Sequence, residues 1–272
     1  MKIQILGGTP GPLPRRGTRT STRDRGVMAI SAGAGPWAMV NMSPTVAHRL
    51  DLQDAQRVAS APQPTRAVLL TDAQVDHVTG LLSLRDGAPI DLYATPAVFE
   101  DLSATLPVLS VLQHYCGVHW HLIPVAGDRQ VASFQVAGLP TLEWTAIAVD
   151  APAPPFSQHS DHPVTGDTIA LAVRDTVTGQ RVFCAPGLAQ IGPQEFDWMR
   201  DADCLLLDGP QAEPDDPGQA PSPGAAALWL DLLQTLPARH KVLLSHGPRV
   251  QDRSSLTDCG FALAYDGMEI QL

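Results

Sequence analysis

Short apolar runs of strand length recur along the chain, separated by turn residues. They predict strands at residues 2–6, 27–31, 67–71, 90–94, 168–173, 181–185, 204–208, 241–245 and 268–272. Longer segments between some of them predict helices at residues 96–106, 108–115, 193–201 and 225–236, and the first and third of these begin with proline. Strands interspersed with helices, without an internal repeat, predict an α/β protein.

The composition narrows the class of protein further. Of 272 residues, 25 are Pro and 22 are Gly, which implies many turns and argues against a coiled coil or a helical bundle. A hydrophobic content of 44% excludes wholesale disorder. Irregular, Pro-rich stretches at residues 9–25, 151–162 and 209–224 are interpreted as long loops of a single domain that spans residues 1–272.

The formal net charge of -10 argues against nucleic acid or an anionic membrane as the main partner. No apolar run is long enough to span a membrane, and the first one is too short for a signal peptide, so we expect a cytoplasmic protein. The four cysteines form no CxxC pair. Cys184 and Cys204 lie in apolar, strand-like runs and are expected to be buried, reduced thiols.

Three predicted strands end in residues that could bind a metal ion. The run at 67–71 leads to Asp76 and His77, the run at 204–208 ends in Asp208, and the run at 241–245 leads to His246. Carboxylate oxygens and imidazole nitrogens at the rim of a sheet suit Zn, Fe or Mn. Taken alone, Asp76 could instead cap a helix and His77 could be exposed. The coincidence at three strand ends favours a metal site.

The layout resembles the metallo-β-lactamase superfamily, whose strand-end motif is His-x-His-x-Asp-His, followed by a bridging Asp and a last His. Here the motif reads Asp72-x-Gln74-x-Asp76-His77, so the two leading histidines are absent. The resemblance implies that the second metal's ligands are kept, at Asp76, His77, Asp208 and His246. One metal ion is therefore expected rather than two.

A closer resemblance is to the pyrroloquinoline quinone biosynthesis protein B family. It rests on segments that occur in the same order along the chain: TDAQVDH at 71–77, TGLLSLR at 79–85, PPFSQH at 154–159, APGL at 185–188, DCLLLDG at 203–209 and AYDGMEIQL at 264–272. The resemblance implies a metallo-β-lactamase-like αββα sandwich of two mixed β-sheets flanked by helices. It also implies a small-molecule or short-peptide substrate and suggests a homodimer.

The same resemblance implies a role in making a peptide-derived quinone cofactor, either as an iron-dependent hydroxylase or as a carrier. An open site of two His and two carboxylates suits Fe(II) and O₂, with Zn as the alternative ion. The remaining polar residues of these segments are then candidates for a second shell or for substrate contact: Asp72, Gln74, His159 and His162. The two histidines could equally be exposed loop residues.

Departures from the family pattern leave three functions open. The stretch 10–21 lacks the family's cysteine cluster, so no structural zinc is expected there. The segment 219–223 is shortened, and residues 246–251 read HGPRVQ rather than His-x-Asn-Asn-Thr-Asn. A mononuclear iron hydroxylase is favoured over a non-catalytic carrier and over a metal-dependent hydrolase. The pair His119 and His121, which flanks Trp120, is interpreted as a structural or surface feature.

Overall fold

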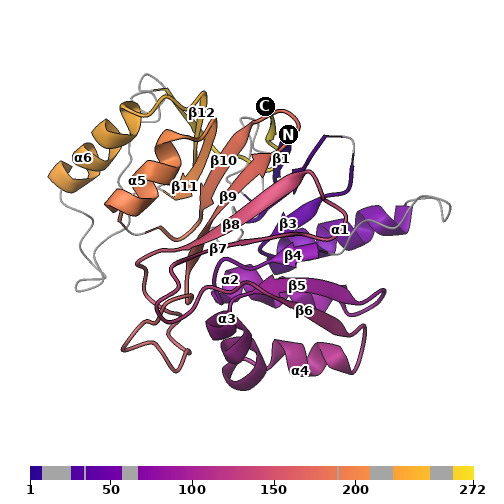
Figure 1. Ribbon diagram of the computed structural model, residues 1–272. Helices are drawn as coiled ribbons and strands as arrows, with labels where there is room; N and C mark the ends of the chain where they lie inside the picture. The colour runs from indigo at the N-terminus through magenta and orange to yellow at the C-terminus, as the bar shows by residue number, and fades with distance from the viewer. Residues whose placement is uncertain (8–25, 34, 57–66, 189, 209–222, 246–259) are drawn as a thin grey trace, which may run out of the picture.

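The computed structural model describes residues 1–7, 26–33, 35–56, 67–188, 190–208, 223–245 and 260–272 (Figure 1). In these ranges the chain forms two seven-stranded sheets that face each other. The predicted loop 9–25 and His246 lie outside the described residues, and so does most of the predicted loop 209–224. The predicted loop at 151–162 is described and contains turns without a helix or strand.

The first sheet has the strand order β14-β1-β2-β3-β4-β5-β6. Its strands are β1 (Lys2–Ile5), β2 (Met28–Ser31), β3 (Ala38–Val40), β4 (Ala67–Leu69), β5 (Ile90–Ala94), β6 (Val118–Leu122) and β14 (Glu269–Gln271). β3 to β6 run parallel, whereas β14, β1, β2 and β3 pair antiparallel. The carboxyl ends of the parallel strands therefore meet at one edge of this sheet.

The second sheet has the strand order β13-β12-β11-β10-β9-β8-β7. Its strands are β7 (Val131–Phe134), β8 (Leu142–Ala148), β9 (Ile169–Asp175), β10 (Arg181–Ala185), β11 (Cys204–Asp208), β12 (His240–Ser245) and β13 (Phe261–Leu263). β10 to β13 are parallel and β7 to β10 are antiparallel. Both sheets are thus mixed.

Helices cover the outer faces of both sheets (Figure 1). The helices that follow strands of the first sheet are α1 (Pro44–Gln56), α2 (Val75–Val78), the 3-10 helix η1 (Thr79–Leu84), α3 (Pro96–Glu100), the π-helical turn η2 (Asp101–Thr105) and α4 (Val108–Gln113). Those that follow strands of the second sheet are α5 (Pro193–Arg200) and α6 (Pro223–Gln234). Local signals explain two helix starts. Thr95 Oγ1 accepts from Val98 N ahead of α3, and the carboxylate of Glu195 accepts from Gly192 N ahead of α5.

Three apolar layers hold these elements together. The largest lies between the sheets, where side chains such as Ile30 and Leu69 of the first sheet and Trp144 and Leu171 of the second are fully buried. The other two lie between each sheet and its helices. Helix, sheet, sheet and helix form four layers, so the predicted αββα sandwich is confirmed.

Several element predictions need correction. The helix predicted at 96–106 changes after Glu100 into a π-turn, in which Leu106 N donates to Asp101 O, five positions back. The sequence prediction also missed α1 and strands β3, β6, β7, β8 and β13. β8 was recognisable, because buried Leu142 and Trp144 alternate with exposed Glu143 and half-buried Thr145 as a strand with one covered face requires.

The cysteine prediction is confirmed for the two strand residues. Cys184 and Cys204 are fully buried and reduced. Burial raises the pKa of the Cys204 thiol to about 12 and raises the pKa of Cys184 as well, so neither thiol ionises at neutral pH. Cys259 lies outside the described residues.

None of the helices in the described ranges is both long enough and apolar enough to cross a membrane.

Candidate functional site

The candidate site begins where β4 ends. Leu70, Thr71 and Asp72 follow the strand and are all buried, and the backbone oxygen of Thr71 accepts a hydrogen bond of 2.8 Å from Ile169 N at the start of β9. That bond ties the end of the first sheet to the second sheet. Residues that follow β4 are therefore held where the two sheets meet.

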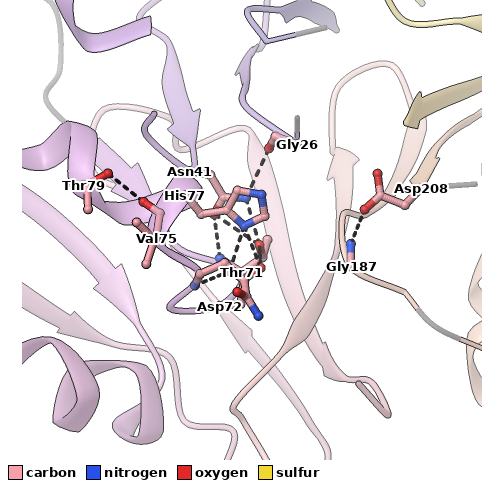
Figure 2. A network of polar contacts seen from close by, with 10 residues as sticks. Gly26, Asn41, Thr71, Asp72, Val75, His77, Thr79, Gly187 and Asp208 are labelled. Carbon is pink, nitrogen blue, oxygen red and sulfur yellow. Dashed lines mark hydrogen bonds and ion pairs between the residues drawn. The ribbon is translucent and has the colours of Figure 1, made fainter. Parts of the chain in front are cut away.

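Asp72 holds the side chain of His77 (Figure 2). Both carboxylate oxygens of Asp72 lie 2.8 Å from His77 Nδ1, and the Asp72 residue is only 2% exposed. Its carboxylate also accepts from Gln74 N at 2.8 Å and from Thr71 Oγ1 at 2.9 Å. Burial alone would raise the pKa of Asp72, but His77 and these hydrogen bonds outweigh it and lower that pKa. Asp72 is therefore ionised, and its two oxygens hold the His77 imidazole while also accepting from Gln74 N and Thr71 Oγ1.

Asn41, which the sequence prediction missed, connects this loop to Gly26 (Figure 2). Its amide Nδ2 donates to Gly26 O at 3.1 Å and to Thr71 Oγ1 at 2.9 Å, and its Oδ1 accepts from Thr71 N at 3.0 Å. The backbone of Asn41 has φ 60°, a left-handed conformation that Asn tolerates better than most residues. An Asn directly after an apolar strand was the available signal.

The main chain around His77 is fixed by close backbone packing. Met42 N donates to His77 O at 2.6 Å, and Gly80 N donates to Met42 O at 3.0 Å. The short helix α2 starts at Val75, before the histidine, so His77 lies on a helix. This arrangement leaves His77 mostly buried, with its Nε2 close to Gly26.

Two glycine positions explain how the second sheet approaches the histidine. A Cβ atom on Gly26 would lie 3.0 Å from His77 Nε2 and 2.7 Å from Pro186 Cβ, so only glycine fits there. Gly187 has φ +86°, and a Cβ atom on it would lie 4.0 Å from Asp72 Oδ2. The turn after β10 therefore packs directly against the Asp72 and His77 pair.

Asp208 reaches the same turn from the end of β11 (Figure 2). Its Oδ2 accepts from Gly187 N at 2.8 Å, and the residue is only 8% exposed. Its other oxygen, Oδ1, is buried and has no hydrogen-bond partner among the described residues. A buried carboxylate oxygen without a partner is costly unless a cation or donor occupies it.

A second histidine and carboxylate pair lies in the loop before β9. His159 Nδ1 is 2.9 Å from Asp167 Oδ1, and Thr95 Oγ1, just after β5, donates to Gly166 O at 2.6 Å. The hydrogen bond to Asp167 raises the pKa of His159, against the effect of burial. The loop therefore carries a histidine that keeps its proton to higher pH than an isolated imidazole.

We expect Asp167→Asn to lower the pKa of His159, because the substitution removes the carboxylate that stabilises the imidazolium. Since the folded pKa is the raised one, the pair's contribution to stability is complete below the ordinary histidine pKa of about 6.5 and is lost as pH rises through the folded value. NMR titration of the imidazole signals measures the pKa of His159 in the wild type and in the variant. Asp161→Asn, in the same exposed loop, is the matched control; an unchanged His159 pKa in Asp167→Asn would contradict the assignment.

The structure thus brings together some of the residues predicted from sequence. Asp72, His77 and Asp208 surround the turn at Gly187, whereas Gln74 contributes its backbone N–H, and His162 is exposed. Asp76 is half-buried on α2, next to His77. Among the residues described, no three His, Cys, Asp or Glu side chains are grouped closely enough to hold a metal ion. The predicted ligand His246 lies outside the described residues, so the ligand set stays a prediction.

Comparison with known proteins identifies the family. Residues 37–246 match the family model described as beta-lactamase superfamily domain. The "Coenzyme PQQ synthesis protein B" of Cupriavidus necator is 39% identical over 95% of this chain and 91% of its own length. The protein of the same name from Methylococcus capsulatus is 33% identical over the full length of both chains.

Similarity to a solved structure supports the fold. The crystal structure of Zn(2+)-bound PqqB from Methylobacterium extorquens superposes with a TM-score of 0.72 and 23% identity, covering all of both chains. The zinc belongs to that protein's structure, and at this identity the likeness concerns the fold. The full-length relatives and the family model show that the chain belongs to the coenzyme PQQ synthesis protein B family, within the beta-lactamase superfamily.

Proposed function

We propose that this protein acts in the synthesis of pyrroloquinoline quinone as a mononuclear, iron-dependent hydroxylase of a tyrosine-type, peptide- or amino-acid-derived intermediate. The names of the full-length relatives support the pathway, and the superfamily supports a metal-dependent reaction. The proposed ligands are Asp76, His77, Asp208 and His246.

The observation that carries metal dependence is the buried Oδ1 atom of Asp208, which has no hydrogen-bond partner in the described part of the chain. Its partner oxygen is already held by Gly187 N, so the carboxylate is fixed with one oxygen available to a cation. Across the same turn, Asp72 at His77 Nδ1 favours the tautomer whose lone pair is on Nε2, a nitrogen with which imidazoles bind metals. His77 and Asp208 thus offer donor atoms of the kind that a metal ion requires, and His246 is expected to complete the set.

The donor chemistry favours iron over a pair of zinc ions. Two imidazoles with carboxylates form the set that non-haem Fe(II) oxygenases use, because it leaves positions open for O₂ and substrate. Positions 72 and 74, where a two-metal site would have histidines, are Asp72 and Gln74, and Asp72 is already occupied by His77, Gln74 N and Thr71. A second metal ion would have to displace that network.

In this site the chain's own residues orient the ligands and exclude water. Asp72 fixes the ring of His77, and Gly26 and Gly187 let the two sheets close around it. Asp208 supplies negative charge that partly neutralises the ion. His159, protonated to higher pH through Asp167, would place positive charge near an acidic substrate group. The bound iron would supply the activation of O₂ for hydroxylation.

Metal analysis tests the proposal. We expect protein prepared with iron to bind one metal ion per chain, and His77→Ala and Asp208→Asn to lose most of it, because each removes a ligand. His121→Ala, on the half-exposed strand β6, is the matched control that should keep the metal. Elemental analysis of the purified proteins gives the ratio, and circular dichroism checks that the variants are folded.

Oxygen uptake with a tyrosine-containing peptide then separates the candidate activities. O₂ consumption that requires both iron and peptide supports the hydroxylase. Metal-dependent cleavage of an ester or phosphodiester without O₂ would identify a hydrolase instead. Tight binding of the quinone by metal-free protein, with no turnover, would identify a carrier and refute the proposal.

A further inference from the structure

Strand β6 forms one edge of the first sheet, opposite the edge at β14. In the part of the chain that the structure describes, β6 pairs with β5 alone, and it lies at the border of the first sheet (Figure 1). Trp120 is 39% exposed and Leu122 is 50% exposed, although both are large apolar residues. A cleft of about 260 Å³ lies beside Trp120 and is lined by Phe99, Leu109, Val118 and Trp120 among others. An unpaired edge with exposed apolar side chains is a template for another strand.

The backbone N–H and C=O groups of every second residue of β6 point away from β5. On the inner side, Gly117 O accepts from Ile90 N and Ile123 N donates to Ala94 O, both within the first sheet. Backbone direction alternates along a strand, so the N–H and C=O groups of residues 118, 120 and 122 point away from β5. The donation of Gln113 Nε2 to Val118 O agrees with this direction. Trp120 therefore lies in the middle of the outward-facing row.

The sequence of β6 reads nearly the same in both directions around Trp120. Apolar Val118 and Leu122 are the outer pair, and His119 and His121 are the inner pair. The two kinds of side chain occupy opposite faces. Trp120 stacks on Phe99 at 3.9 Å between ring centroids, whereas His121 and His119 approach Asp91 Oδ1 on the other face, at 2.9 and 3.5 Å.

We infer that β6 pairs antiparallel with β6 of a second copy of this chain, about a two-fold axis at Trp120. In this register the outward backbone groups of Trp120 bond to those of the second Trp120, and Val118 N–H donates to Leu122 O of the second copy. The Val118 oxygen, which accepts from Gln113 Nε2, has a second lone pair for Leu122 N–H of the second copy. The two-fold axis places apolar side chains beside apolar ones and histidines beside histidines, so both faces of the joined sheet stay continuous.

The self-complementary pattern is what selects a second copy over an unrelated strand. A two-fold axis at residue 120 pairs residue 118 of one copy with residue 122 of the other, residue 119 with residue 121, and residue 120 with itself. The order apolar, His, Trp, His, apolar places like residues opposite each other in all of these pairs. The pairing uses the β6 edges of both copies at once, so association through β6 closes as a dimer. This inference is independent of the proposed chemistry.

The test is the mass of the protein in solution, measured by light scattering during size exclusion. We expect wild-type protein to have twice the mass of one chain. Leu122→Lys should halve that mass, because a charged edge residue opposes strand pairing. Val177→Lys, which replaces another exposed apolar residue far from β6 in sequence, is the matched control and should remain a dimer. Thermal unfolding confirms that both variants are folded.

A second substitution tests the register. Residues 118 and 122 of one strand lie about 13 Å apart, too far to pair within a chain. In the proposed dimer each faces the other across the axis, so Val118→Glu combined with Leu122→Lys should restore the dimer that Leu122→Lys alone loses. A monomeric wild type, a dimeric Leu122→Lys variant, or a folded double variant that stays monomeric would each overturn the proposal.

Discussion

Replacing Asp72 with alanine is expected to lower the free energy of unfolding by about 3–5 kcal/mol, the cost of breaking a buried ion pair by removing one partner. The carboxylate is 2% exposed and serves His77 Nδ1, Gln74 N and Thr71 Oγ1. The substitution would leave these buried groups without their acceptor. Urea unfolding, monitored by circular dichroism, measures the difference.

Asp91→Ala is the matched control for this prediction. Asp91 also contacts a histidine at 2.9 Å, His121, but the Asp91 side chain is 30% exposed and that of His121 is 40% exposed. Such a pair contributes about 0–1 kcal/mol. An Asp72→Ala variant that loses no more stability than Asp91→Ala would show that the Asp72 network does not stabilise the fold.

The same network makes stability depend on acidity. The pKa of Asp72 is lower in the folded protein than in the unfolded chain. The contribution of Asp72 to the free energy of unfolding is therefore present above the ordinary Asp pKa, about 4, and is lost as pH falls through the pKa of the folded state. The wild-type protein should therefore lose more stability on acidification than Asp72→Ala. Parallel acid titrations of the two proteins would reveal this difference.

Replacing Gly80 with alanine is expected to destabilise the protein by about 3 kcal/mol or more, at the upper end of the cost of overpacking. A Cβ atom on Gly80 would lie 2.3 Å from Ser43 O and 2.6 Å from Met42 O. Both are backbone atoms, which cannot rotate away. Moving them would stretch the hydrogen bond from Gly80 N to Met42 O, next to the bond that fixes His77 O.

Gly35→Ala supplies the comparison, because a Cβ atom on Gly35 would meet nothing within 4 Å. We expect the midpoint of thermal unfolding of Gly35→Ala to stay near that of the wild type, and the midpoint of Gly80→Ala to fall by many degrees. Equal midpoints for the two variants would mean that the backbone at Ser43 yields easily, contrary to the tight packing described above.

The sequence allowed the apolar strands to be predicted, because burial makes them recognisable by composition. β5, β10 and β11 match their predicted bounds, and the family resemblance led to the correct sandwich. β6 was not predicted as a strand, because its half-exposed edge carries His119, Trp120 and His121 in place of an apolar run. Edge strands lack the signal that two covered faces impose.

Within the site, sequence reasoning located Asp208 and His77 but gave Asp72 only a secondary place. The contact of Asp72 with His77 depends on the helix start at Val75, which turns the imidazole back toward β4. Asn41 and Gly26 join from distant segments, and no local spacing shows that they meet Thr71. Such contacts arise from tertiary packing rather than from a motif.

The pairing of β1 with β14 affects how the protein is made. Ile3 lies opposite Ile270, 267 positions later, so this border of the first sheet forms only after β14 has been synthesised and has left the ribosome. Until then the backbone groups of β1 that face β14 are unpaired within the sheet, and other nascent chains could pair with them. Contacts this distant in sequence slow folding, so β14 has the role of a closing segment whose late arrival ends the period of greatest risk of aggregation.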